Sequence, residues 1–252
     1  MQKSRRTWSL VWSAVVVLVV AGPAAAQFRE MAARVPNTAN AMVLLNVEKI
    51  FQSPKAVAEG WREKIDKAFE AGLARVPPKS VRYVIASQVD FESMEPRWEA
   101  AVIDFTAAPS LEEVANVREG TPEKIGNVPA VALPTDALVL PLGEKTLGAI
   151  APANRQEATR WIRQLSNPQS PKLSPYLQKG ASYSDTTGSE IIMVLDLDGV
   201  FPPDPVLKYL KTKKALDPFA GDRVDLAKLI SEMDGLRVGI RIGGEGDRKN
   251  HP

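Results

Sequence analysis

Apolar residues recur along the chain at the spacings of strands and helices. Ala41 to Val47 is a nearly unbroken apolar run of strand length. Ser53 and Pro54 follow it as a helix N-cap and a proline at the first helical position. Apolar side chains then repeat at spacings of four and three up to Pro77, which predicts one amphipathic helix with its stripe in the core. The stripe consists of Val57, Trp61, Ile65, Phe69, Leu73 and Val76.

The middle of the chain predicts antiparallel strands with short helices between them. Val81 to Phe91 and Arg97 to Phe105 are strand-like runs around a turn at 92–96, which is typical of a hairpin. Two capping boxes each predict the start of a helix. The first is Ser110 with Glu113, followed by inward Leu111, Val114 and Val117; the second is Asn154 with Glu157, followed by inward Ala158, Trp161, Ile162 and Leu165. Strand-like runs at Val128–Leu133, Ala137–Pro141 and Thr146–Ile150 lie between these helices.

The pattern of residues 42–54 returns at residues 193–205. MVLLNVEKIFQSP can be aligned with MVLDLDGVFPPDP, so that Met42 matches Met193 directly, and with a slip of one residue Asn46 falls on Asp196. Each segment leads into helical patterns and then a strand. The later helical patterns are 204–216 and 225–233, and the later strand is Leu236 to Ile242. We interpret this as a weak internal duplication, with a period far above those of solenoid repeats.

These elements predict an α+β protein with a mixed, largely antiparallel sheet and helices packed on one face, built as one full unit and a partial second repeat. The first unit spans 27–166, a proline- and serine-rich linker or connection spans 167–190, and the partial second unit spans 191–242. A disordered polar tail is predicted for 243–252. Without a hairpin partner, the strand from Leu236 to Ile242 would be an exposed sheet edge, which predicts pairing with a missing strand or an intermolecular one, self-association included.

The first 26 residues have the three-part pattern of a secretory signal peptide. A basic segment precedes a short apolar run, which lacks the ~20 residues that a membrane-spanning helix needs. Small residues then predict cleavage between Ala26 and Gln27, and a periplasmic or extracellular location. The sequence from Ser4 to Trp8 resembles the twin-arginine export motif, while the apolar run suits Sec export equally well. The features are Lys3, Arg5 and Arg6, the run from Leu10 to Ala21, and Ala24 to Ala26.

Composition narrows the chemistry that this chain can carry. It has no cysteine, which excludes disulfides, thiolate nucleophiles and cysteine-type zinc sites. Its single histidine is His251, so a histidine-based catalytic triad would have to use a residue of the tail. The formal charge of +2 includes three basic residues of the predicted signal peptide. Nothing in the charge therefore points to nucleic acid.

Ile191 to Val200 (IIMVLDLDGV) resembles the first motif of the haloacid-dehalogenase phosphotransferases. The resemblance implies Asp196 as the nucleophile that forms an aspartyl-phosphate, Asp198 as general acid and base, and Mg²⁺ bridging Asp196 and the phosphate. In that family a serine or threonine, a lysine and a late acidic pair follow on downstream strands. No adjacent acidic pair follows Asp198, and Asn46 and Glu48 occupy the matching positions of the first repeat.

The sequence therefore favours an exported, non-enzymatic envelope protein with a binding or scaffolding role and no cofactor. Its expected partner is a protein or another envelope component, and it meets the membrane only transiently, through the signal peptide. The chain also resembles exported bacterial proteins of unknown function that pair such α+β units. A Mg²⁺-dependent phosphohydrolase that uses Asp196 and Asp198 is the alternative.

Overall fold

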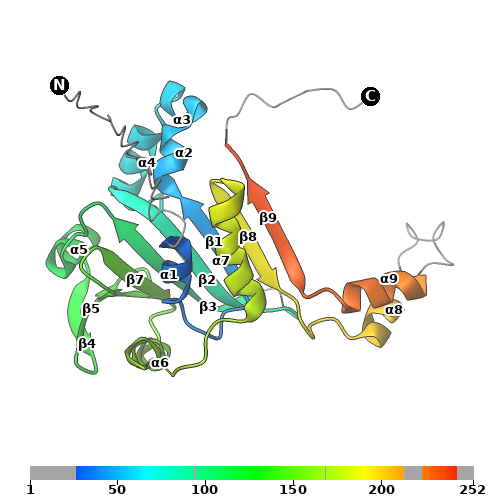
Figure 1. The fold of residues 1–252 in the computed structure, drawn as a ribbon. Helices are drawn as coiled ribbons and strands as arrows, with labels where there is room; N and C mark the ends of the chain where they lie inside the picture. Colours follow the sequence, from blue (N-terminus) through cyan, green and yellow to red (C-terminus); the bar gives the residue numbers. More distant parts are fainter. Residues whose placement is uncertain (1–26, 94, 168, 213–222, 243–252) are drawn as a thin grey trace, which may run out of the picture.

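The structure is a computed structural model that describes residues 27–93, 95–167, 169–212 and 223–242 (Figure 1). The predicted signal peptide, up to Ala26, and the tail from 243 to 252 lie outside the described residues. Gln27, the residue after the predicted cleavage point, opens the first helix.

Nine strands of the described part form one sheet in the order β4-β5-β6-β7-β3-β2-β1-β8-β9. Every neighbouring pair is antiparallel, which confirms the prediction of an α+β protein with a largely antiparallel sheet. The strands are β1 (Ala41–Asn46), β2 (Ser80–Asp90), β3 (Glu95–Phe105), β4 (Thr121–Ile125), β5 (Val128–Leu133), β6 (Ala137–Pro141), β7 (Thr146–Ala151), β8 (Ile191–Asp196) and β9 (Gly235–Ile240). The described helices are α1 (Gln27–Ala32), α2 (Val47–Gln52), α3 (Pro54–Ala58), α4 (Trp61–Glu70), α5 (Leu111–Arg118), α6 (Arg155–Ser166), α7 (Pro175–Thr187), α8 (Pro203–Lys211) and α9 (Arg223–Ser231).

The main helical layer covers one face of this sheet (Figure 1). Buried residues of α1, α6 and α7 pack there against alternate residues of the central strands. Trp161 of α6 anchors the layer, because its side chain is almost fully buried and its Nε1 donates to the Arg34 carbonyl at 2.6 Å. On the opposite face a smaller cluster includes Val47 of α2 and Ala115 of α5, which lie against β2, β3 and the strands beyond them.

The long helix predicted after Ser53 is wrong, because the chain forms α3 and α4 as separate helices. Gly60 stands between them in the left-handed conformation (φ +62°), which changes the direction of the chain. The predicted stripe therefore does not form one core face. Val57 is 67% exposed and Leu73 is 84% exposed.

The segment 167–190, predicted as a linker, contains α7 and belongs to the core. Leu177 and Ala181 are fully buried against the sheet. Gly180 lets the helix approach β8 closely, because a Cβ at this position would lie 2.5 Å from a methyl group of Val194. The proline- and serine-rich sequence suggested a loop, but small residues on one side of α7 instead allow tight packing on the sheet.

The other local predictions agree well with the structure. The β2–β3 hairpin is present, and Ser110 and Glu113 form the complete capping box of α5. Asn154 caps α6 by accepting two backbone N–H groups. Two residues predicted to face inward, Val117 and Leu165, are exposed instead, because α5 and α6 each bury a narrower face. Strand β4, a polar strand at the far edge of the sheet, is not predicted by the sequence pattern.

The two segments that the duplication pairs have the same topology. In the first, β1 leads through helices to β2, which lies antiparallel beside it; in the second, β8 leads through α8 and α9 to β9, also antiparallel and adjacent. Strands β1 and β8 pair with each other at the centre of this group of four. A pseudo-two-fold axis between β1 and β8 therefore relates the segments.

Backbone hydrogen bonds across this axis follow the same symmetry. The Asn46 N–H donates to the Glu190 carbonyl at 2.8 Å, and the Asp196 N–H donates to the Asn40 carbonyl, also at 2.8 Å. Asn46 and Asp196 are thus equivalent strand ends, and Asn40 and Glu190 are equivalent residues before the strands.

Both segments also use the same side-chain clamp. Asn40 Oδ1 accepts the Val89 N–H on the neighbouring strand at 2.7 Å, and Glu190 Oε2 accepts the Ile242 N–H at 2.9 Å. A side-chain oxygen at the base of one strand therefore holds the end of the next strand in each segment.

The symmetry selects the slipped alignment, with Asn46 on Asp196, and contradicts the direct match of Met42 with Met193. Met42 is buried under the main helical layer, whereas Met193 is 48% exposed and points to the opposite face. Side chains alternate along a strand, so a shift of one residue exchanges the two faces of the sheet.

Candidate binding surface

Asp196 and Asp198, the candidate residues of the phosphotransferase resemblance, lie in the turn after β8. Asp196 is half-buried, and its Oδ1 accepts the Asp198 N–H at 3.2 Å, while Asp198 is exposed. Its equivalent Asn46 works in the same way at the end of β1, because its Oδ1 accepts the Lys49 N–H at 3.0 Å and caps α2. The structure therefore gives Asp196 a local role, in which its side chain closes a turn.

The group that the resemblance implies for Mg²⁺ is not assembled in the described part of the chain. Over the described ranges, no three histidine, aspartate or glutamate side chains gather into a potential metal site. Within the same ranges, neither Asp196 nor Asp198 forms an ion pair. These residues do not fit the Mg²⁺ site of that family.

A different feature stands out one strand further along, where β9 ends the sheet order as the sequence pattern predicts. Val238 lies opposite Met193 of β8, and Leu236 and Ile240 flank Val238 on the same face of β9. These four side chains are 40%, 48%, 54% and 41% exposed, respectively. We call this group the β8–β9 apolar face. Contiguous apolar side chains of this kind mark interaction surfaces more often than single exposed residues do.

The first segment covers the equivalent face. Tyr83 pairs with Leu45 as Leu236 pairs with Leu195, so Tyr83 is the counterpart of Leu236. Tyr83 is only 7% exposed, and burial raises the pKa of its hydroxyl above the ordinary value. Val47 of α2 packs in the same cluster as Tyr83.

The described helices of the second segment leave the outer face of their strand pair uncovered. In place of α2, this segment has α8 and α9, which pack on each other and extend beyond the end of the sheet (Figure 1). The β8–β9 apolar face therefore lacks the cover that α2 gives to β2, although the strand topology is the same.

Arg237 of β9 and Arg241, directly after the strand, lie on its other face. The Arg237 guanidinium lies 4.6 Å from the ring centre of Tyr183 and 5.8 Å from that of Tyr176, both on α7. Arg241 donates to the Thr187 carbonyl at the end of the same helix. Neither arginine has a carboxylate partner among the residues that the structure describes. The helical side of this edge is therefore positively charged and without a counter-ion from the described chain.

The backbone of β9 has hydrogen-bonding groups that point away from β8. The Leu197 N–H donates to the Asp234 carbonyl at 2.9 Å, and this pairing fixes which residues of the two strands bond each other. Groups alternate along a strand, so N–H and C=O of Arg237 and Gly239 face outward from the sheet. No described strand pairs with these groups. An unpaired row of this kind is a template for an added strand.

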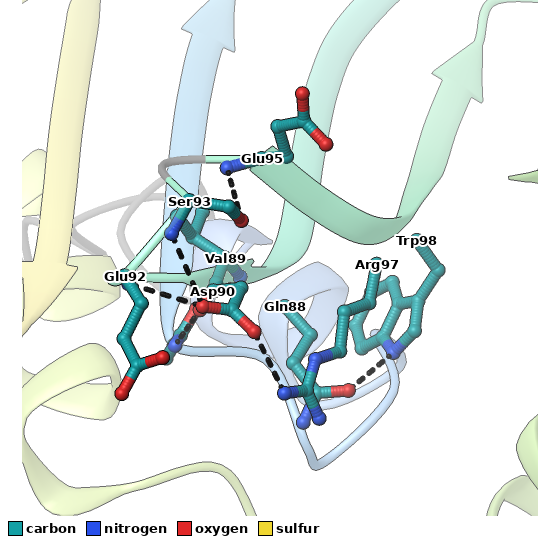
Figure 2. Close-up of polar contacts among 9 residues, drawn as sticks. Gln88, Val89, Asp90, Glu92, Ser93, Glu95, Arg97 and Trp98 are labelled. Carbon is teal, nitrogen blue, oxygen red and sulfur yellow. Dashed lines mark hydrogen bonds and ion pairs between the residues drawn. The ribbon is translucent and has the colours of Figure 1, made fainter.

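The hairpin end of β2 and β3 forms a separate shallow hollow of about 350 Å³. Figure 2 shows that Asp90 accepts the N–H groups of Glu92 and Ser93, and Arg97 Nη2 at 2.8 Å. The Arg97 hydrogen bond, with the two backbone N–H groups, holds the pKa of Asp90 below its ordinary value. These contacts are all within the hairpin, so their role is to close the turn.

A second hollow, of about 240 Å³, lies between α1 and the ends of β2, β3 and β7. Thr146 Oγ1 accepts from Arg34 at 3.1 Å and donates to Asp104 at 2.8 Å. Arg82 lies 3.7 Å from the other oxygen of Asp104. Opposite charges therefore lie close together in this hollow, and the contacts connect the strands to the segment after α1.

Within the described ranges, none of the helices has the length and apolar character needed to cross a membrane. No family model matches the chain, and no curated protein matches it. Among solved structures, crystal forms I, IV and III of TP0453 are similar to it, with 12%, 10% and 12% identity and TM-scores of 0.42, 0.43 and 0.43. The matches cover 68%, 68% and 71% of this chain and 63%, 65% and 67% of those chains, so this chain spans about two thirds of their length.

Proposed function

We propose that this protein is an exported, non-enzymatic binding protein of the cell envelope, and that the β8–β9 apolar face is its binding surface. The observation that carries the proposal is the contrast between two equivalent residues. Tyr83 is 7% exposed under α2, whereas Leu236 is 54% exposed at the sheet edge. Exposed apolar area beside an unpaired strand favours association, because a partner removes that area from water and pairs the backbone groups.

The proposed location outside the inner membrane rests on the sequence of the first 26 residues. A basic segment, a short apolar run and small residues before Gln27 are the parts that export requires. Export is tested by comparing the full chain with a variant that lacks residues 2–26 in an export-competent bacterium. We expect the full chain to lose its signal peptide and to be degraded by protease added outside the inner membrane. Full protection of the full chain from that protease would contradict export.

The binding surface is tested with a photo-crosslinking amino acid placed at Val238 of the exported protein. The matched controls carry the same group at Leu73 or Val117, which are exposed apolar residues elsewhere on the protein. We expect light-dependent crosslinks at Val238 to at least one discrete envelope component, and far weaker crosslinks at the two control positions. Equal crosslinking at all three positions, or none at Val238, would contradict the proposed surface.

A further inference from the structure

We propose, resting on the proposed function, that β9 binds an extended segment of a partner polypeptide in which apolar and acidic residues alternate. The segment would add to the sheet as a further strand beside β9. Three features of the described chain support this: the outward backbone groups of β9, the apolar residues on one face, and the arginines on the other.

The first segment shows which structure completes such an edge. Strand β3 lies antiparallel beside β2 over its whole length, and β2 is the counterpart of β9. The clamp from Glu190 to Ile242 holds β9 in the same position that the clamp from Asn40 to Val89 gives β2. The edge of β9 is therefore preformed for a neighbour on its free side, and an antiparallel strand is the arrangement that the fold itself uses there.

The alternation of side chains decides the chemistry of the added strand. Residues of a partner that lie on the same face as Leu236, Val238 and Ile240 would extend the β8–β9 apolar face, so apolar side chains suit these positions. Residues between them would lie beside Arg237 and Arg241, which have no carboxylate partner in the described chain. Acidic side chains suit those positions, because opposite charges on neighbouring strands attract.

A second copy of this chain fits the edge less well. Two β9 strands related by a two-fold axis would keep each face on the same side of the joined sheet, as β1 and β8 do. Arg237 and Arg241 of both copies would then share one face, where like charges repel. Charge therefore favours a different, acidic strand over self-association.

The test uses the full exported protein and a labelled synthetic peptide, EVEVEVEV, in a fluorescence anisotropy titration. The matched probe is KVKVKVKV, with the opposite charge. A further probe, EVEPEVPV, has one glutamate fewer, and its prolines remove strand hydrogen bonds. We expect EVEVEVEV to bind most tightly, with affinity falling as salt rises. The double variant R237E/R241E should bind EVEVEVEV at least fivefold more weakly and should bind KVKVKVKV more tightly than the parent protein does.

The control variant is K64E/K67E, which changes the net charge by the same amount on exposed residues of α4. We expect its peptide affinities to stay within twofold of the parent protein, and circular dichroism checks that each variant is folded. Hydrogen exchange with bound EVEVEVEV should protect the amides of Arg237 and Gly239.

Three results would overturn the strand-addition proposal. The first is equal affinity of EVEVEVEV for the parent protein and R237E/R241E, or no binding tighter than about 1 mM. The second is protection of β9 amides by a concentration-dependent dimer without peptide, which would make a second copy the occupant. The third is tight binding of EVEPEVPV. If Val238 still crosslinks to an envelope component in any of these cases, the binding surface stands and only the alternating acidic strand fails.

Discussion

The two strand pairs of this protein, β1 with β2 and β8 with β9, share a topology and differ in what covers them. Their central strands pair across a pseudo-two-fold axis, and Asn40 and Glu190 clamp the outer strands in the same way. Strand β2 has β3 at its edge and α2 on its outer face, whereas no described strand or helix takes either place at β9. The two pairs therefore share their pairing and clamps, and they differ in the edge strand and the covering helix.

Both segments keep the hydrogen bonding and register of the pair, and each pair is buried on its inner face. Burial of the outer face is not required, because Leu236 and Val238 stay exposed where Tyr83 and Ile85 are covered. The second segment is therefore free to present a surface that the first segment uses for its own core. This difference between equivalent strands is the basis of the proposed function.

The largest expected effect compares truncation at equivalent positions. Tyr83→Ala should lower the free energy of unfolding by about 3 kcal/mol, because it leaves a cavity under α2. Leu236→Ala should lower it by less than about 1 kcal/mol, since the side chain is already exposed. Urea unfolding measures both values, and similar losses would show that the two faces are equally buried in solution.

The next effect concerns α7, which packs against β8 and β9 on the helical face of the second pair. Gly180→Ala places a Cβ 2.5 Å from a methyl group of Val194. Overpacking of this kind should lower the free energy of unfolding by about 1–3 kcal/mol. Thr186→Ala, at an exposed position of the same helix, is the control. Hydrogen exchange should show faster opening of β8 and β9 than of β2 and β3 in Gly180→Ala. Uniform loosening of all four strands would contradict a local role for this contact.

A smaller effect tests the equivalence of the clamps. Asn40→Ala removes two hydrogen bonds to the Val89 backbone, and Glu190→Ala removes the bond to the Ile242 N–H and a 3.8 Å ion pair with Lys49. Each change should lower the free energy of unfolding by about 1–2 kcal/mol. Amide hydrogen exchange should become faster only in the strand that the clamp holds. Thermal unfolding and amide exchange together measure this. A loss at Glu190 without faster exchange at Ile242 would reject the second clamp.

The smallest effect lies at the β2–β3 hairpin, which has no counterpart after β9 in the described part of the chain. The pKa of Asp90 is lowered first by the Arg97 hydrogen bond, so its carboxyl should titrate below its ordinary value of 3.8. Because the folded-state pKa is depressed, this contribution to stability is present above that value and is lost as pH falls through the folded-state pKa. Arg97→Ala should move the titration midpoint of Asp90 upward in an NMR titration. An unchanged midpoint would show that Arg97 is not the main cause of the lowered pKa of Asp90.

Local patterns were sufficient for most strands and for the helix caps. Alternation and turn residues predicted the β2–β3 hairpin, and Ser110 with Glu113 predicted the cap of α5. The separation of α3 from α4 was missed, because a left-handed Gly60 leaves the spacing of apolar residues intact. The packing of α7 was also missed, because its contact depends on a glycine that faces Val194 across the structure.

The edge position of β9 could be predicted, but the binding surface could not. The alternation from Leu236 to Ile242 predicted a strand, and the polar, glycine-rich residues 243–252 directly after it offered no hairpin partner. Exposure of the apolar face depends on where α8 and α9 go after β8, which is a matter of tertiary packing. Likewise, Asp196 matches a catalytic motif in sequence, yet its equivalence to Asn46 appears only when both strand ends are placed around the axis.

The most direct test of the central claim compares amide exchange of the two equivalent strands in one dilute sample of the exported protein. The outward-facing amides of β2 are paired with β3, so they should be strongly protected. The amides of Arg237 and Gly239 should exchange far faster, and they should become protected when a strand-forming partner is added. Protection of these two amides equal to that of β2 in the dilute protein without partner would contradict the account.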